Sequence, residues 1–134
     1  MIELILPPRH VAAWPKAEPL LAKATARFDT GFETPDLFDR INIGRSHLWK
    51  VNDWDAAVIT EIQTWPTHRS LLVCYLGGVN LDDWFEELMI AIEMAAVQWK
   101  CKYVEVHGRR GWLKPGSKRG YSEVTTVFRK QVDG

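Results

Sequence analysis

The sequence lacks several features that would place it at once in a specialised class. Lysine and arginine together number 17, and aspartate and glutamate also number 17, so the formal net charge is zero. A chain without excess charge has no overall field that would attract nucleic acid or an anionic membrane. No apolar run reaches the roughly 18 residues that cross a bilayer, and the first residues lack the basic start and long apolar stretch of a secretion signal. We therefore expect a soluble, intracellular protein that does not enter a membrane.

Cysteine and histidine are scarce and are not spaced as metal ligands. The two cysteines, Cys74 and Cys101, lie in apolar segments, where a free thiol packs as a small hydrophobic group. The four histidines show neither paired spacing nor the matching cysteines of a zinc site. The sequence thus favours reduced cysteines, no metal site, and histidines at the surface or at strand edges.

The hydrophobic pattern predicts a mixed α/β fold in one domain, residues 1–134, which is long enough to close a single core. The first helix is expected to begin near Pro15 or Pro19, because proline favours the first turn of a helix. A late strand-helix-strand unit joined to an antiparallel meander predicts a mostly antiparallel central sheet of about six strands, with helices on both faces. Strands are expected at 2–6, 47–51, 56–62, 71–76, 102–107 and 124–132, and helices within 11–30, at 34–43 and at 80–99.

The best-defined helix is expected to begin at Asn80, a residue type that favours the N-cap, with Asp83 in the place of a capping-box acid. Its first two turns carry Asp82, Asp83, Glu86 and Glu87. Acids at this end complement the helix dipole, so ordinary helix chemistry is sufficient to explain them.

Several short motifs are spread along the chain. They are Trp14-Pro15, Leu48-Trp49, the strand Ala57 to Ile62, Leu76-Gly77-Gly78, Trp84, the segment Gly108 to Trp112, Gly120-Tyr121, and Arg129-Lys130 at the end of the last predicted strand. Together with the order of the elements, these motifs resemble the general N-acetyltransferase (GNAT) superfamily. The likeness extends over nearly the whole sequence and is closer still to small GNAT-like proteins of tailed bacteriophages and prophages.

This resemblance implies where a cofactor would lie. In active members of the superfamily, the turn after the fourth strand carries an Arg or Gln and then glycines, and its amides bind the pyrophosphate of coenzyme A at the start of a helix. The corresponding residues here are Gly77, Gly78 and Asn80. The Arg or Gln and the last part of the motif are missing, and carboxylates follow at once. The resemblance therefore implies acetyl-coenzyme A binding only if the protein is active, and we expect no cofactor.

The resemblance also implies catalytic positions. The superfamily's usual general acid is a tyrosine, and Gly116 occupies that position. Glu61 is the only acid inside an otherwise apolar predicted strand, which makes it the candidate general base if the protein is active. The alternative is that Glu61 simply faces solvent, because side chains alternate along a strand.

A basic segment near the end of the chain forms a candidate interaction surface, made of Arg109, Arg110, Trp112, Lys114, Lys118 and Arg119. Cations interleaved with aromatic rings can bind single-stranded nucleic acid, but they can equally dock on the acidic start of the 80–99 helix of another copy or on another protein. A solvated loop is the third interpretation.

Together these features favour a GNAT-fold protein with a degenerate acetyl-CoA site. We expect it to act as a virion-associated or host-interacting protein in the host cytoplasm or the virion, with other phage virion proteins or a second copy as its partner. The alternative is an active acetyl-CoA-dependent N-acetyltransferase that acts on an amine. A nucleic-acid-binding protein is a third class, against which the zero net charge argues.

Overall fold

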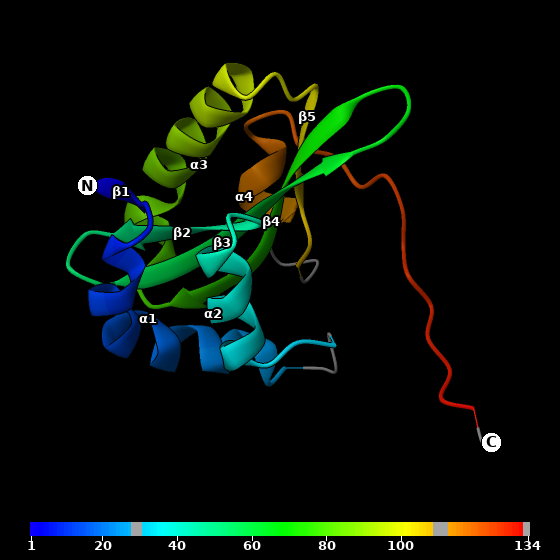
Figure 1. Ribbon diagram of the computed structural model, residues 1–134. Helices are drawn as coiled ribbons and strands as arrows, with labels where there is room; N and C mark the ends of the chain where they lie inside the picture. Colours follow the sequence, from blue (N-terminus) through cyan, green and yellow to red (C-terminus); the bar gives the residue numbers. More distant parts are fainter. Residues whose placement is uncertain (28–30, 109–112, 133–134) are drawn as a thin grey trace.

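The computed structural model describes residues 1–27, 31–108 and 113–132, which form a five-stranded sheet with helices on both faces (Figure 1). The strand order is β1-β2-β3-β4-β5, so consecutive strands are neighbours. The first three pairings are antiparallel, and β4 and β5 run parallel because α3 connects them. The elements are β1 (Ile2–Ile5), α1 (Arg9–Thr25), α2 (Thr34–Asn42), β2 (Ser46–Val51), β3 (Ala56–Thr64), β4 (Arg69–Gly78), α3 (Leu81–Gln98), β5 (Tyr103–Val106) and α4 (Leu113–Ser117).

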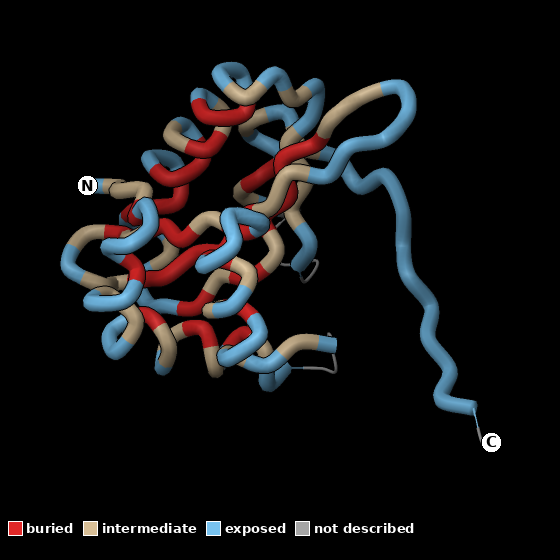
Figure 2. The backbone as a smooth tube through the Cα atoms, in the orientation of Figure 1, coloured by how far each residue is buried: buried red, intermediate tan, exposed pale blue. Residues whose placement is uncertain are grey.

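The sheet is buried on both faces, which divides the core into two clusters (Figure 2). On one face, Leu88 and Ile92 of α3 pack with Val58 and Val73. On the other, α1 and α2 cover the sheet, with Leu21 and Leu37 among the fully buried side chains. The predicted mixed α/β fold with helices on both faces is confirmed. None of the helices in the described residues is long and apolar enough to cross a membrane.

One predicted strand does not form. Residues 122–132 are extended and exposed, and they take no part in the sheet, which therefore has five strands rather than about six (Figure 2). The segment has the composition of a strand, but a strand needs a neighbouring backbone to complete its hydrogen bonds. In the described part of this single chain, no strand lies beside it.

The first helix begins earlier than predicted. α1 starts at Arg9 and contains both Pro15 and Pro19 in its interior. A proline inside a helix removes one backbone hydrogen bond and leaves a carbonyl group unpaired. The two prolines are four residues apart and both lie on the exposed side of α1. Water can therefore hydrogen-bond to the carbonyl groups that have no amide partner in the helix.

The start of α3 also differs in detail from the prediction. Asn80 is the N-cap residue, but it has left-handed backbone angles (φ 60°, ψ 41°) and its side chain makes no capping hydrogen bond. Instead the Asp83 amide donates to the Asn80 carbonyl oxygen at 2.9 Å. A complete capping box is present on α2, where Glu33 and Asp36 cap each other.

Candidate functional site

Strand β4, which lies between β3 and β5, contains an extra residue. Ile59 of β3 pairs with Tyr75 and Thr60 pairs with Val73, so Cys74 has no opposite residue and forms a bulge. As a result, Cys74 and Tyr75 both pack against the α1 and α2 cluster although they are adjacent in the chain. Burial raises the pKa of the Cys74 thiol to about 12, which leaves it protonated and unreactive as a nucleophile.

The parallel ladder between β4 and β5 ends next to this bulge. Their ladder runs from Ser70 opposite Tyr103 to Val73 opposite Val106, and the His107 amide donates to the Val73 carbonyl oxygen at 3.0 Å. β4 continues to Gly78, and in the described residues β5 does not accompany it. Ligand sites of α/β proteins lie at the carboxyl ends of parallel strands. The edge of β4 beyond Val73, which has no β5 partner among the described residues, is here called the β4–β5 opening and is the first candidate site.

The predicted cofactor residues Gly77 and Gly78 are the last two residues of β4 and lead into the turn before α3. Close packing against other backbone segments requires glycine at both positions. A Cβ atom on Gly77 would lie 1.8 Å from the carbonyl oxygen of Leu20 in α1. A Cβ atom on Gly78 would lie 2.3 Å from the carbonyl oxygen of Asp55. The next amide, that of Val79, donates to this Asp55 oxygen at 2.9 Å and so is already engaged. The turn is thus held against α1 and the β2–β3 turn by close backbone contacts.

The four acids at the start of α3 are all exposed, and they have different surroundings. Glu87 is 3.2 Å from the amino group of Met1, and Glu86 is 3.5 Å from Arg119. Asp82 and Asp83 lie in the first turn, where a phosphate would approach the helix. Their charges oppose such an approach because like charges repel over this distance.

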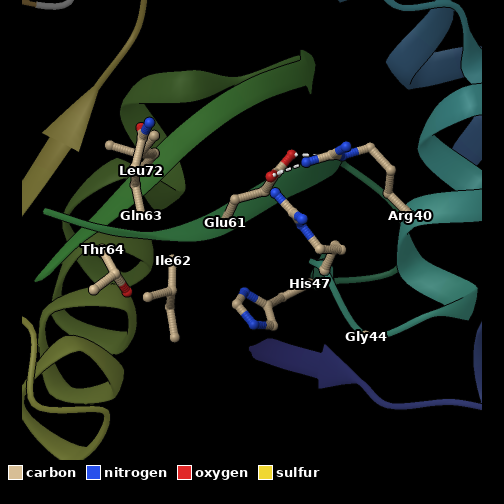
Figure 3. Close-up of a pocket in the computed structure, with 9 residues that line it drawn as sticks. Arg40, Gly44, His47, Glu61, Ile62, Gln63, Thr64 and Leu72 are labelled. Atoms are coloured by element: carbon tan, nitrogen blue, oxygen red, sulfur yellow. Dashed lines mark hydrogen bonds and ion pairs between the residues drawn. The ribbon is translucent and has the colours of Figure 1, made fainter.

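Glu61, the predicted base, does not face bulk solvent. Arg40 of α2 points at it, and the two form a bidentate pair: Nη2 to Oε1 at 2.6 Å and Nε to Oε2 at 3.1 Å (Figure 3). Hydrogen bonding to Glu61 raises the pKa of Arg40. The side chains are 24% and 17% exposed, so the pair is partly shielded from water. Arg40 thus occupies both oxygens of the carboxylate.

The pair forms one wall of an open notch of about 560 Å³ (Figure 3). The notch exists because β2 pairs with β3 only as far as Ser46 opposite Glu61, whereas β3 continues to Thr64. It is lined by Arg40, Gly44, Arg45, His47, Glu61, Ile62, Gln63, Thr64 and Leu72. Most of the polar side chains in its walls carry hydrogen-bond donors. Leu72, which pairs with Glu105 in the β4–β5 ladder, also lines the notch, so the notch reaches the neighbouring strand β4.

His47 lines the notch on the opposite face of the sheet from Glu61. Its Nδ1 is 3.0 Å from the hydroxyl oxygen of Thr60, which also accepts a 2.9 Å hydrogen bond from the indole of Trp49. The imidazole lies 4.6 Å from the ring of Trp99, measured between centroids. Burial lowers the pKa of His47, so the neutral ring is favoured at pH 7.

Two expectations for the histidines are wrong. His47 is partly buried, and His10 is almost fully buried, 1% exposed, with its Nε2 3.0 Å from the amide oxygen of Asn42. The alternation of His47 with Trp49 on one face of a strand was a usable signal for its burial. The contact between Arg40 and Glu61 had no such signal, because it joins residues on two elements far apart in the sequence.

The predicted basic surface is only partly described by the structure. Arg109, Arg110 and Trp112 lie outside the described residues. Lys114 and Lys118 are exposed, as an interaction surface would need. The remaining member, Arg119, is turned inward together with Tyr121.

Arg119 and Tyr121 fasten the last helix to α3. Arg119 forms a bidentate pair with Glu93 at 2.8 and 3.3 Å, and the Tyr121 hydroxyl donates to the same carboxylate at 2.9 Å. Burial and the bond to Glu93 raise the pKa of Tyr121. Gly116 allows this contact, because a Cβ atom there would lie 3.3 Å from Cβ of Tyr121. Arg119 is therefore engaged within the chain.

Within the described residues, His, Cys, Asp and Glu side chains form no group of three that could hold a metal ion.

No protein-family model and no curated protein sequence matches the chain. Solved structures, in contrast, match it over its full length. A probable acetyltransferase has a TM-score of 0.74 at 10% identity, over 100% of this chain and 99% of that chain. A GNAT family acetyltransferase from Staphylococcus aureus has a TM-score of 0.65 at 14% sequence identity, and the match covers 98% of each chain. An aminoglycoside acetyltransferase from an uncultured soil metagenomic sample, in complex with sisomicin, has a TM-score of 0.73 at 10% sequence identity. That match covers 99% of this chain and 96% of the other. Likeness at this level of identity establishes architecture, and the chain has the fold of the GNAT acetyltransferases.

Proposed function

We propose that the protein is an N-acetyltransferase that takes an acetyl group from acetyl-coenzyme A and transfers it to an amine. The observation that carries the proposal is the β4–β5 opening, which lies at the bulge on Cys74 and leads into the start of α3. The fold around it is shared, end to end, with proteins described as acetyltransferases.

The residues of the opening fit one part of the cofactor better than the other. The amide-containing arm of coenzyme A is extended, and amides of this kind bind well along the backbone edge of a strand such as β4. The diphosphate would approach the first turn of α3, where the helix dipole attracts it and Asp82 and Asp83 repel it. We therefore expect binding that depends mainly on the arm and is weak for the phosphates.

The bound cofactor would supply an activated thioester, and the chain must then accept a proton from the attacking amine. Glu61 is the candidate base, acting through water, with Arg40 fixing the position of its carboxylate. Because Arg40 occupies both oxygens, proton transfer to Glu61 needs the pair to loosen, which predicts slow transfer.

Thermal unfolding with and without coenzyme A tests the proposal. A ligand present at about 100 times its dissociation constant adds roughly 2.7 kcal/mol of stability, which shifts the melting temperature upward by several degrees. We expect such a shift at millimolar coenzyme A, together with release of free thiol from acetyl-coenzyme A when an amine is added. A melting temperature that stays constant at millimolar coenzyme A would reject the enzyme.

A second function is supported by a different observation. Asp82 and Asp83 stand where the diphosphate would lie, the Val79 amide is engaged by Asp55, and Gly116 stands at the position of the usual tyrosine. These features favour a GNAT-fold protein without transfer activity that binds another protein, with a virion-associated or host-interacting role. The association with phage rests on the sequence resemblance alone.

Charge neutralisation separates the two functions. If the opening binds coenzyme A, the double variant Asp82→Asn/Asp83→Asn should lower its dissociation constant roughly three- to tenfold, because the first turn no longer repels the phosphates. Asp39→Asn removes an equally exposed charge from α2 and serves as the control, with unchanged affinity. Titration calorimetry measures both. Absence of binding by the wild type and by the double variant would support the second function.

A further inference from the structure

The C-terminal segment 122–132, here called the tail, exposes more apolar surface than a solvated terminus needs (Figure 2). Val124, Val127, Phe128 and Val132 are 79%, 82%, 92% and 77% exposed. Burying a side chain of this size stabilises a protein by about 1.5–3 kcal/mol. Four such groups on a short extended segment indicate a surface that is covered in the working form of the protein.

The tail also has the pattern of a half-buried strand. One set of alternate positions is Val124, Thr126, Phe128, Lys130 and Val132, which is mainly apolar, and the other is Glu123, Thr125, Val127, Arg129 and Gln131, which is mainly polar. β-branched and aromatic residues favour strands, and an alternation of this kind puts one face against a core. The tail therefore has a strand's sequence and, in the described chain, no strand beside it.

The sheet has a matching edge at β5. β5 is the last strand of the sheet, and within the described residues its outer side has no strand neighbour. Val104 and Val106 face the α3 cluster and remain partly exposed at this edge. An exposed edge of this kind is a template for a further strand.

The direction of the tail favours an edge on a second copy. The contacts of Arg119 and Tyr121 with Glu93 fix the start of the tail on α3. From there the tail runs away from the sheet (Figure 1), and residues 122–132, extended at about 3.3 Å each, can span about 36 Å. Each copy has one tail and one β5 edge. In a reciprocal exchange about a twofold axis, the tail of each copy pairs with the β5 edge of the other, and the result is a closed dimer.

We propose that the protein forms a strand-exchanged dimer in which the tail of each copy adds to the outer edge of β5 of the other. The apolar positions Val124, Phe128 and Val132 extend the layer made by Val104 and Val106. The added strand completes a six-stranded sheet in each copy. The proposal is independent of acetyl transfer, since it involves neither the β4–β5 opening nor the notch.

Sedimentation velocity of the full chain across the micromolar range tests the dimer. We expect a dimer for the wild type, and Phe128→Asp should weaken it by roughly thirtyfold or more, as loss of a central apolar contact does at interfaces. Thr125→Asp adds the same charge on the polar face of the same tail and is the matched control, with a dissociation constant close to that of the wild type. Both changes lie outside the folded core, so the melting curve of the monomer should not change.

A truncated chain ending at Tyr121 supplies the second arm of the test. It should be a folded monomer, and a synthetic peptide of residues 122–132 should bind to it and slow the hydrogen exchange of the Val104 and Val106 amides. A wild-type monomer with protected tail amides would mean that the tail folds onto its own β5, and it would overturn the proposal. A dimer that survives Phe128→Asp or the truncation would overturn it as well.

Discussion

Gly77 allows the backbones of β4 and α1 to approach closely, because glycine has no Cβ atom. The Gly77→Ala change would place a methyl group 1.8 Å from the Leu20 carbonyl oxygen, and both partners are backbone that cannot rotate away. We expect a loss of at least about 3 kcal/mol in the free energy of unfolding, the upper range for overpacking, measured by urea denaturation. Gly116→Ala is the control, because its added methyl would meet Tyr121 at 3.3 Å. Equal effects at the two sites would contradict this account of Gly77.

His47 makes the stability of the fold depend on pH. Burial lowers its pKa in the folded state below the ordinary value of 6.5, so the unfolded chain binds a proton more readily than the folded one. The contribution of the neutral ring is complete above pH 6.5 and is lost as the pH falls toward the folded-state pKa. Urea midpoints should therefore decrease between pH 7.5 and pH 5.5.

Substitution of His47 isolates its part of this pH dependence. His47→Gln should flatten the decrease, whereas His107→Gln should not, because the His107 side chain is 58% exposed. A decrease that persists unchanged in His47→Gln would assign the effect to another group. The sequence analysis placed His47 at the surface or at a strand edge, because the contact with Trp99 joins residues that are far apart in the chain.

At the scale of elements, the pair Arg40–Glu61 joins α2 to the far end of β3. The two side chains are partly shielded, and charged hydrogen bonds of this kind contribute about 1–2 kcal/mol. A double-mutant cycle with Arg40→Ala and Glu61→Ala should give a coupling energy of that size. The exposed pair Arg9–Glu3 provides the comparison, and its coupling should be much smaller because water screens it. Similar coupling energies for the two pairs would mean that partial burial does not strengthen the interaction between Arg40 and Glu61.

The elements that could be predicted are those whose signal is local. The apolar run Leu71 to Leu76 and the apolar stripe of α3 identify their own structure, since each pattern has the period of the element that it forms. The start of α1 could not be predicted in the same way. Pro15 and Pro19 indicate a helix start by propensity, but their exposure on one side of α1 is a tertiary fact.

For the whole molecule, the order of elements was enough to predict the sheet and its two helical layers, because strand-helix-strand units and meanders have few ways to close. For the candidate site, the sequence could indicate single residues but not the residues that they contact. The sequence located Gly77, Gly78 and Glu61, but their partners Leu20, Asp55 and Arg40 are distant in the chain. The sixth strand was predicted from its composition, and a pattern within one chain cannot show whether the neighbouring strand belongs to the same copy.

The extra residue in β4 affects the proposed cofactor site and not the core. Without Cys74, Val73 and Tyr75 would follow each other in a regular ladder and would keep the faces that they now have. The bend that a bulge imposes would disappear, and β5 could then continue along β4 past Val73. A chain without Cys74 should therefore keep its core and lose the unpaired edge of β4 on which the proposed acetyl transfer depends.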